Sequence, residues 1–365
     1  MTRALVLALA LCLVATATVR ADEAEKPAVR AGIDTEIYGF IKLDTAWDDG
    51  KVNVGNFARW VDTGAVDPGQ IHMTARQTRL GLRFHAPETG GVDARGRLEI
   101  DFYGGTIENK SGLLLRHAFL TLLWDGPDLS LLAGQTSDVI SPLVPATINY
   151  TVAWWSGNIG YRRPQIRLTQ QFKAGRSTFI LQAAATAAID AEEEGAPGAQ
   201  GRVAISFPAP QRTAVVGVSG HISNAASNST SWSGNVDLTV PIGAKLNLKA
   251  EAFTGQALAG YFGGIGQSYT DSLQTEIRSQ GGWAALAVGP FEEIAFNFGG
   301  GLDDPDDADL IAGQRSRNVN GFGNVMWKLR PQVAVGAEVS WWETAYKDAE
   351  TWSSWRGQLT FILTI

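Results

Sequence analysis

The sequence contains few of the groups on which enzymes and metal centres depend. It has one cysteine, Cys12, and four histidines, His72, His85, His117 and His221, which fall on separate segments without the spacing of metal ligands. It contains neither a G-x-S-x-G motif nor a phosphate-binding P-loop. We therefore expect no enzymatic activity, no metal site and no cofactor.

Charged residues are scarce as well. Asp, Glu, Lys and Arg make up 18% of the chain, and its formal net charge is −7. A general nucleic-acid binder must neutralise many phosphates, so this balance argues against a nucleic-acid partner. Intrinsic disorder is also disfavoured, because 12 Trp, 15 Phe and 7 Tyr supply far more apolar surface than a disordered chain carries.

Long apolar runs are missing after the first residues. A positive start is followed by the apolar stretch Ala4–Val19 and by Val19-Arg20-Ala21, which predicts a secretory signal peptide over residues 1–21. The alternative is a single anchor helix, although this stretch is short for a membrane span of about 20 residues. Cleavage would remove Cys12 and would leave residues 22–33 as a short linker before the folded part.

Over residues 34–365 the sequence does contain segments in which apolar and polar residues alternate with a period of two. Between Thr78 and Ala86, for example, Leu80 and Phe84 share one face while Arg79 and Arg83 share the other. Such alternation predicts β-strands with one apolar and one polar face. About sixteen such segments can be counted. They lie near 36–47, 75–86, 93–104, 114–124, 128–136, 163–172, 177–189, 201–208, 212–223, 231–240, 244–255, 279–288, 291–300, 317–328, 332–343 and 354–365.

Two all-β architectures fit this pattern. In a secreted structural or adhesive β-sandwich the apolar faces meet inside, whereas in a transmembrane antiparallel β-barrel they meet lipid and the polar faces line a wet lumen. Strands of about ten residues match a tilted membrane strand. Arginines and carboxylates share the polar faces, and aromatic residues such as Trp47, Trp124 and Trp327 lie near strand ends. These features favour the barrel, with the sandwich as the alternative.

Several short motifs occur in an order that is similar to that of known channels. They are Tyr38-Gly39-Phe40-Ile41-Lys42-Leu43-Asp44, Arg76-Gln77-Thr78-Arg79-Leu80-Gly81-Leu82, Arg116-His117-Ala118-Phe119, Leu132-Ala133-Gly134-Gln135-Thr136 and Arg163-Pro164-Gln165-Ile166-Arg167. In these motifs the chain resembles the trimeric general porins and, more narrowly, the DcaP-like outer-membrane porins. The resemblance implies a sixteen-stranded homotrimer in the Gram-negative outer membrane, in contact with its lipid and lipopolysaccharide. It also implies that residues 137–161, after the fifth strand, fold inward as a constriction loop.

The chemistry of the lumen follows from the residues that would point inward. The basic ones are Arg79, Arg83, Arg95, Arg97, Arg163 and Arg167, and the acidic ones are Asp44, Glu99 and Asp101. Arg116 is ambiguous, because Leu120 and Leu122 share its parity. Guanidinium groups remain charged and bind carboxylates through paired hydrogen bonds. We therefore expect passive diffusion of small hydrophilic solutes with a preference for anionic, carboxylate-bearing ones; the alternative is that Arg–carboxylate pairs only brace the wall.

Other residues allow more than one interpretation. Tyr150, Trp154 and Trp155 in the expected constriction loop could form a stacking surface for sugars or could anchor the loop. The acidic segment 303–309 is typical of a hydrated loop, with a divalent-cation bridge to lipopolysaccharide phosphates as the alternative. An outer-membrane barrel hydrolase would need a lipid-facing Ser–His pair, for which only His117 could supply the histidine.

Overall fold

The computed structural model describes residues 32–64, 69–105, 111–124, 126, 128–187, 197–209, 212–225 and 229–365. The expected signal peptide, residues 1–21, lies outside these residues. The chain divides into Met1–Ile33 and Asp34–Ile365, and all the strands of the described residues belong to the second unit. Among the described residues, no helix has both the length and the apolar character needed to cross a membrane.

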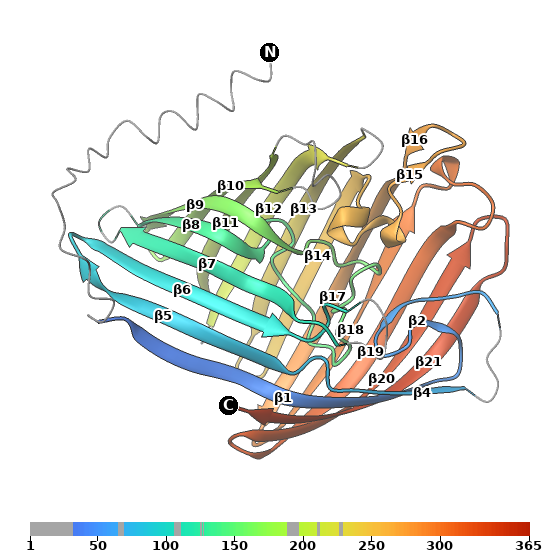
Figure 1. Ribbon diagram of the computed structural model, residues 1–365, viewed down its shortest axis with the longest axis horizontal. Helices are drawn as coiled ribbons and strands as arrows, with labels where there is room; N and C mark the ends of the chain where they lie inside the picture. The colour runs from blue at the N-terminus through green and yellow to red at the C-terminus, as the bar shows by residue number, and fades with distance from the viewer. Residues whose placement is uncertain are drawn as a thin grey trace. The chain divides into compact units, whose positions relative to one another are not determined.

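Seventeen strands of Asp34–Ile365 form one continuous sheet that closes into a ring (Figure 1). Neighbouring strands are antiparallel, and the last one pairs with the first, with Thr364 opposite Phe40. The strands are β1 (Asp34–Asp48), β4 (Gln70–Thr74), β5 (Arg79–Thr89), β6 (Val92–Asp101), β7 (Leu114–Trp124), β8 (Leu129–Ser137), β9 (Arg162–Ala174), β10 (Ser177–Thr186), β11 (Gly198–Ala209), β12 (Arg212–Asn224), β13 (Thr230–Ile242), β14 (Leu246–Gln256), β17 (Arg278–Phe291), β18 (Ile294–Pro305), β19 (Arg315–Arg330), β20 (Val333–Tyr346) and β21 (Trp352–Thr364). Closure removes the exposed strand edges that an open sheet would have.

Two of these strands occupy a single position in the ring. Asp44–Asp48 of β1 pairs with β4, and Asp34–Phe40 of the same edge pairs with β5. Between β4 and β5 the chain turns, with the Thr78 amide donating to the Ala75 carbonyl at 2.9 Å. The barrel therefore has sixteen strand positions, which confirms the predicted architecture.

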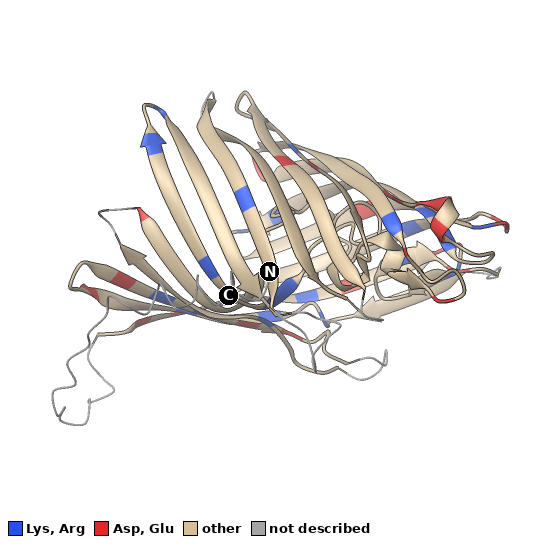
Figure 2. Ribbon diagram, turned by 90° about the horizontal axis from the view of Figure 1, so that it is seen from above, with Lys and Arg blue, Asp and Glu red and all other residues tan. Residues whose placement is uncertain are grey.

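The outer surface of the barrel is apolar. Leu80, Leu98 and Phe361 remain 40%, 39% and 51% exposed, whereas Glu99 and Arg356 on the opposite faces are buried inside the ring. Trp47 and Trp327 are also exposed on the outside. A β-sandwich would bury the apolar faces, so the sandwich interpretation is wrong. Figure 2 shows how sparsely Lys, Arg, Asp and Glu occur along the strand wall.

Short turns join the strands at one end of the barrel and longer connections join them at the other. The first long connection contains the hairpin β2 (Val52–Val54) and β3 (Ala58–Val61), and the connection from β14 to β17 contains η2 (Ala259–Tyr261), η3 (Gly264–Gly266), β15 (Tyr269–Thr270) and β16 (Thr275–Glu276). The connection from β18 to β19 contains η4 (Asp307–Asp309). The barrel begins and ends at the short-turn end, as an even number of strand positions requires.

Three long connections contact one another within the ring of strands. The Ala58 amide donates to the Asn149 side chain at 3.0 Å, which joins the first connection to the segment between β8 and β9. The Trp155 amide donates to the Phe262 carbonyl at 2.8 Å, which joins that segment to the β14–β17 connection. The segment between β8 and β9, hereafter loop 138–161, therefore lies between the other two connections (Figure 1).

Candidate functional site

Loop 138–161 is held closed at its base by one carboxylate. Asp138 accepts hydrogen bonds from the Tyr161 amide and from the Gln200 side chain, both at 2.8 Å. Its Oδ1 also lies 2.7 Å from Nε of Arg163. The two ends of the loop and the neighbouring wall therefore meet at Asp138.

The middle of the loop is fixed to strands on other parts of the wall. Glu251 of β14 accepts from the Leu143 amide at 2.8 Å, and Glu338 of β20 accepts from the Ile148 amide at 2.7 Å. Both carboxylates are buried. Because buried backbone N–H groups are costly to leave without acceptors, these acids determine where the loop lies against the strands.

Gly157 allows the loop to lie directly against the wall. Its φ of +114° is in the left-handed region, and a Cβ there would collide with the Gly282 carbonyl oxygen of β17. Only glycine tolerates both the conformation and the close approach. The loop backbone consequently sits in van der Waals contact with the strands.

The aromatic residues of the loop fall into two groups. Trp154 and Trp155 are buried and pack around Phe262 with ring-centroid distances of 4.9 and 4.4 Å. Tyr150 stacks on Tyr103 at 3.9 Å and donates to Asp101 at 3.3 Å. Burial raises the pKa of Tyr150 to about 12.

Glu99 is the centre of a cluster of basic side chains on the wall opposite the loop. Its carboxylate is 1% exposed and accepts from Nε of Arg116 and from the Tyr38 hydroxyl, both at 2.8 Å, and from Arg97. The Nε of Arg79 lies 3.4 Å from the same carboxylate. The cluster brings together several side chains that the alternation placed on the inner face.

Arg116 enters this cluster because of a β-bulge. Glu99 lies opposite His117 while Ile100 lies opposite Leu115, so Arg116 is an extra residue in the ladder. A bulge reverses the alternation, and both Arg116 and His117 are buried within the barrel. His117 bonds to the Thr136 hydroxyl at 3.0 Å and does not face lipid, which removes the histidine on which the hydrolase interpretation depended.

A cavity of about 370 Å³ separates this basic wall from loop 138–161. Arg79, Arg116 and Arg162, from β5, β7 and β9, line one side of it. The loop supplies mostly apolar and aromatic side chains to the other side. These are Ile140, Pro142, Leu143, Val144, Tyr150, Val152, Trp154, Ile159 and Tyr161.

Arg162 is the lining residue that the sequence analysis missed. The alternation of β9 selects Arg163 as inward-facing, yet Arg162 at the junction of loop and strand also turns inward, with its guanidinium 4.4 Å from the centroid of the Tyr161 ring. Two consecutive arginines at a loop–strand junction are the signal that could have identified it, because alternation does not apply before the strand is established.

Arg163 and Arg167 lie beside the base of the loop. Arg163 is fully buried against Asp138 and the Tyr261 ring, 3.8 Å from the ring centroid, and solvent does not reach it. Arg167 donates to the Gln165 side chain at 2.9 Å and to the Ser137 carbonyl. Both side chains hold neighbouring segments together.

Arg83, Arg95 and Arg97 line a second hollow, of about 660 Å³, nearer the short-turn end. Arg83 pairs with Glu36 at 2.8 Å, and Arg95 pairs with Asp93 at 2.6 Å. Arg83, Glu36 and Arg95 are substantially exposed to solvent, whereas Asp93 is buried. Arginines therefore continue along this wall below the cavity, here together with the carboxylates of Asp34 and Glu36.

Asp44 stands apart from the arginines. Its carboxylate lies 3.3 Å from Nζ of Lys42 and accepts from Gln358 at 3.2 Å. Lys42 in turn donates to the Ile148 carbonyl at 3.4 Å. Asp44 thus belongs to the contacts that support loop 138–161 from β1.

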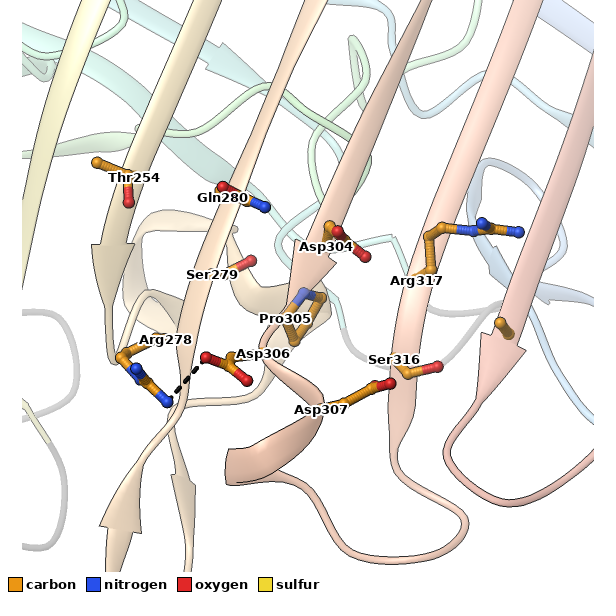
Figure 3. Close-up of a pocket in the computed structure, with 11 residues that line it drawn as sticks. Thr254, Arg278, Ser279, Gln280, Asp304, Pro305, Asp306, Asp307, Ser316 and Arg317 are labelled. Carbon is orange, nitrogen blue, oxygen red and sulfur yellow. Dashed lines mark ion pairs between the residues drawn. The ribbon is translucent and has the colours of Figure 1, made fainter.

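The acidic segment 303–309 lies at the long-loop end (Figure 3). Asp306 and Asp309 each approach Arg278 to 2.8 Å. Asp303 is buried and accepts from the Ser279 hydroxyl at 2.5 Å. Within the described part of the chain, no group of three or more His, Cys, Asp or Glu side chains is arranged to hold a metal ion.

The fold is that of outer-membrane porins. The chain is similar to the outer membrane channel DcaP of Acinetobacter baumannii, with 21% identity, a TM-score of 0.73 and coverage of 92% of this chain and 98% of that chain. It is also similar to the anion-selective porin from Comamonas acidovorans (13% identity, TM-score 0.61, coverage 91% and 100%) and to OmpT, an outer membrane protein of Vibrio cholerae, in a trimer form (9%, 0.58, 92% and 100%). No protein-family model and no curated protein matches the chain. The resemblance seen in the sequence is confirmed at the level of the fold.

Proposed function

We propose that this protein is an outer-membrane porin through which small hydrophilic solutes diffuse passively, with a preference for anionic, carboxylate-bearing ones. The observation that carries the proposal is the cavity between loop 138–161 and the wall, which Arg79, Arg116 and Arg162 line. The loop narrows the lumen at this point, so a solute passing the constriction meets guanidinium groups.

The positions of the acids favour anions. Glu99 and Asp101 are the carboxylate partners of Arg79 and Arg116, but both are buried behind them and do not line the cavity. Asp138 also lines the cavity, but it is buried and paired with Arg163. The surface that a solute meets is therefore mainly basic, although the wall as a whole contains both signs. A narrow, low-dielectric passage lined by one sign of charge concentrates ions of the opposite sign.

The arginines divide between two roles under this proposal. Arg79, Arg116 and Arg162 act on the solute at the constriction, while Arg83, Arg95 and Arg97 extend the basic path toward the short-turn end. Arg163 and Arg167 brace the loop, as the alternative interpretation of the arginines expects. Asp44, Glu99 and Asp101 support these groups, and Tyr150 connects the loop to Asp101.

The apolar outer surface suits a membrane. Export through a cleaved signal peptide would bring the chain to the outer membrane, where its outer face would contact lipid and lipopolysaccharide. The proposal includes a homotrimer, supported by the sequence resemblance to trimeric general porins and by the trimer form in which the similar OmpT was solved.

Swelling of proteoliposomes tests the channel. Vesicles with the purified protein should swell in isotonic solutions of small sugars and, faster, in solutions of carboxylate salts of similar size. Vesicles without protein are the control. Equal rates in the two kinds of vesicle would contradict the channel, and faster entry of neutral or cationic solutes than of carboxylates would contradict the anion preference.

A further inference from the structure

Arg162 differs from the other two arginines of the cavity, because no carboxylate of the described residues lies within ion-pair distance of it. Arg79 and Arg116 each lie within ion-pair distance of Glu99. Arg162 is 7% exposed, and its Nε and Nη2 have no hydrogen-bond partner among the described residues. A buried cation without an acceptor is costly, and this one lines a cavity that a ligand can enter.

The surroundings of Arg162 are aromatic. Its guanidinium lies 4.4 Å from the Tyr161 ring centroid and 5.6 Å from that of Trp154. Ring faces attract the cation but do not supply hydrogen-bond acceptors. A carboxylate that enters the cavity would supply two acceptor oxygens to the planar guanidinium.

The loop presents apolar surface to the same cavity. Val144 is 48% exposed although it lies within the ring of strands, and Pro142 is exposed beside it. Both line the cavity. Removing this surface from water is favourable, so an apolar group attached to the bound carboxylate would add to the affinity.

These contacts discriminate against a small diacid. One carboxylate can pair with Arg162, while the charges of Arg79 and Arg116 are already shared with Glu99 and Asp101. A second carboxylate on a short chain would face the apolar loop and would lose hydration without gaining a partner. The volume of about 370 Å³ accommodates a single ring with its carboxylate.

We propose that the cavity is a binding site for amphipathic monoanions, in which Arg162 binds one carboxylate and the Pro142–Val144 face of the loop covers an apolar or aromatic body. This inference rests on the proposed function, because it assigns a preferred class of solute to the constriction. It adds a saturable site to a channel that would otherwise act only by charge and size.

Calorimetric titration of the detergent-solubilised protein measures the binding directly. Benzoate should bind about tenfold more tightly than acetate or succinate, because only benzoate supplies both an anion and an apolar ring. Binding of benzoate no tighter than of acetate, or tighter binding of succinate, would overturn the proposal.

Three variants locate the site. Arg162→Gln should weaken benzoate binding by about tenfold, as expected for loss of a charged hydrogen-bonding partner. Val144→Thr, which has nearly the same shape, should weaken benzoate binding but not acetate binding. Arg330→Gln, at an exposed arginine at the end of β19 and outside the cavity, is the control and should bind as the wild type does.

Folding is verified separately. Arg162→Lys retains the charge and should recover part of the lost affinity, and each variant should keep the wild-type β-sheet circular dichroism and heat-dependent mobility in gels. Loss of benzoate binding in Arg330→Gln to the same extent as in Arg162→Gln would place the site elsewhere and would overturn the proposal.

Failure of the channel and failure of the site give different results. Chloride conductance in planar bilayers tests the channel without benzoate, while calorimetry tests the site without a membrane. A conducting, anion-selective protein that binds benzoate no better than acetate would retain the proposed function and refute this inference. A protein without conductance that binds benzoate through Arg162 would refute the proposed function and retain the binding site.

Discussion

The Arg116 guanidinium lies between two buried carboxylates, with Nε 2.8 Å from Oε1 of Glu99 and Nη1 2.6 Å from Oδ2 of Asp101. It reaches both because the bulge in β7 turns it to the inner face. Without it Asp101 would lose its ion pair, and Glu99 would keep only Arg79 and Arg97 as basic partners.

Arg116→Met should therefore destabilise the barrel strongly. Removing one member of a buried ion pair typically costs about 3–5 kcal/mol, because the partners lose their compensation. The free energy of unfolding in urea, measured in detergent micelles, checks this. Arg95→Gln removes an exposed arginine and should cost at most about 1 kcal/mol, so equal losses in the two variants would contradict the buried network.

Gly157 should be required for the position of loop 138–161. Gly157→Ala adds a Cβ that collides with the Gly282 carbonyl, so the loop must move away from β17. Single-channel recordings should then show an altered conductance and more current noise. Gly313→Ala is the matched control. The φ of Gly313 is also positive, at +83°, but no atom lies within 4 Å of the added Cβ. Unchanged conductance in Gly157→Ala would contradict the tight packing.

Thiol labelling should distinguish the surface of the loop that faces the cavity from the one that faces the wall. Val144→Cys should react with an anionic, water-soluble thiol reagent and the modification should reduce conductance, since this side chain is exposed in the cavity. Ile148→Cys should react much more slowly, because Ile148 is buried against Gly336 of β20 and does not line the cavity. The wild type, whose one cysteine, Cys12, falls in the expected signal peptide, serves as the unlabelled control. Equal labelling rates would show that the loop is not packed as described.

Tyr150 should ionise late in an alkaline titration. Its pKa in the folded protein is about 12, whereas an unperturbed tyrosine has a pKa of about 10. The unfolded chain ionises first as pH rises, so the stability that neutral Tyr150 contributes is present below about pH 10 and is lost toward pH 12. The ultraviolet absorbance of tyrosinate should differ between the wild type and Tyr150→Phe only near pH 12. A difference near pH 10 would contradict the burial of this phenol.

The strand pattern and its orientation could be predicted from the sequence because a barrel imposes one rule on every strand. Leu80 and Leu98 face outward and Glu99 faces inward, as the period of two requires. The expected segment near 114–124 coincides with β7. Alternation depends only on local strand geometry, which is why it predicted strands along most of the chain.

The site was less accessible to the same reasoning. A bulge at Arg116 and a loop–strand junction at Arg162 both interrupt the period of two. No local residue type indicates the bulge, and only the consecutive arginines Arg162 and Arg163 indicate the junction. The anchoring of loop 138–161 by Glu251 and Glu338 depends on contacts between residues about 100 to 200 positions apart in the chain. Periodicity cannot supply such long-range contacts, so only the family resemblance indicated where the loop would lie.

The reversal potential in a potassium chloride gradient tests the central claim most directly. If the constriction presents Arg79 and Arg162 to passing ions, the wild-type channel should show the sign of potential expected for chloride preference. The Arg79→Gln/Arg162→Gln double variant should shift it toward zero, while Arg330→Gln, at the exposed end of β19, should leave it unchanged. A wild-type potential of the sign expected for potassium preference would contradict the account.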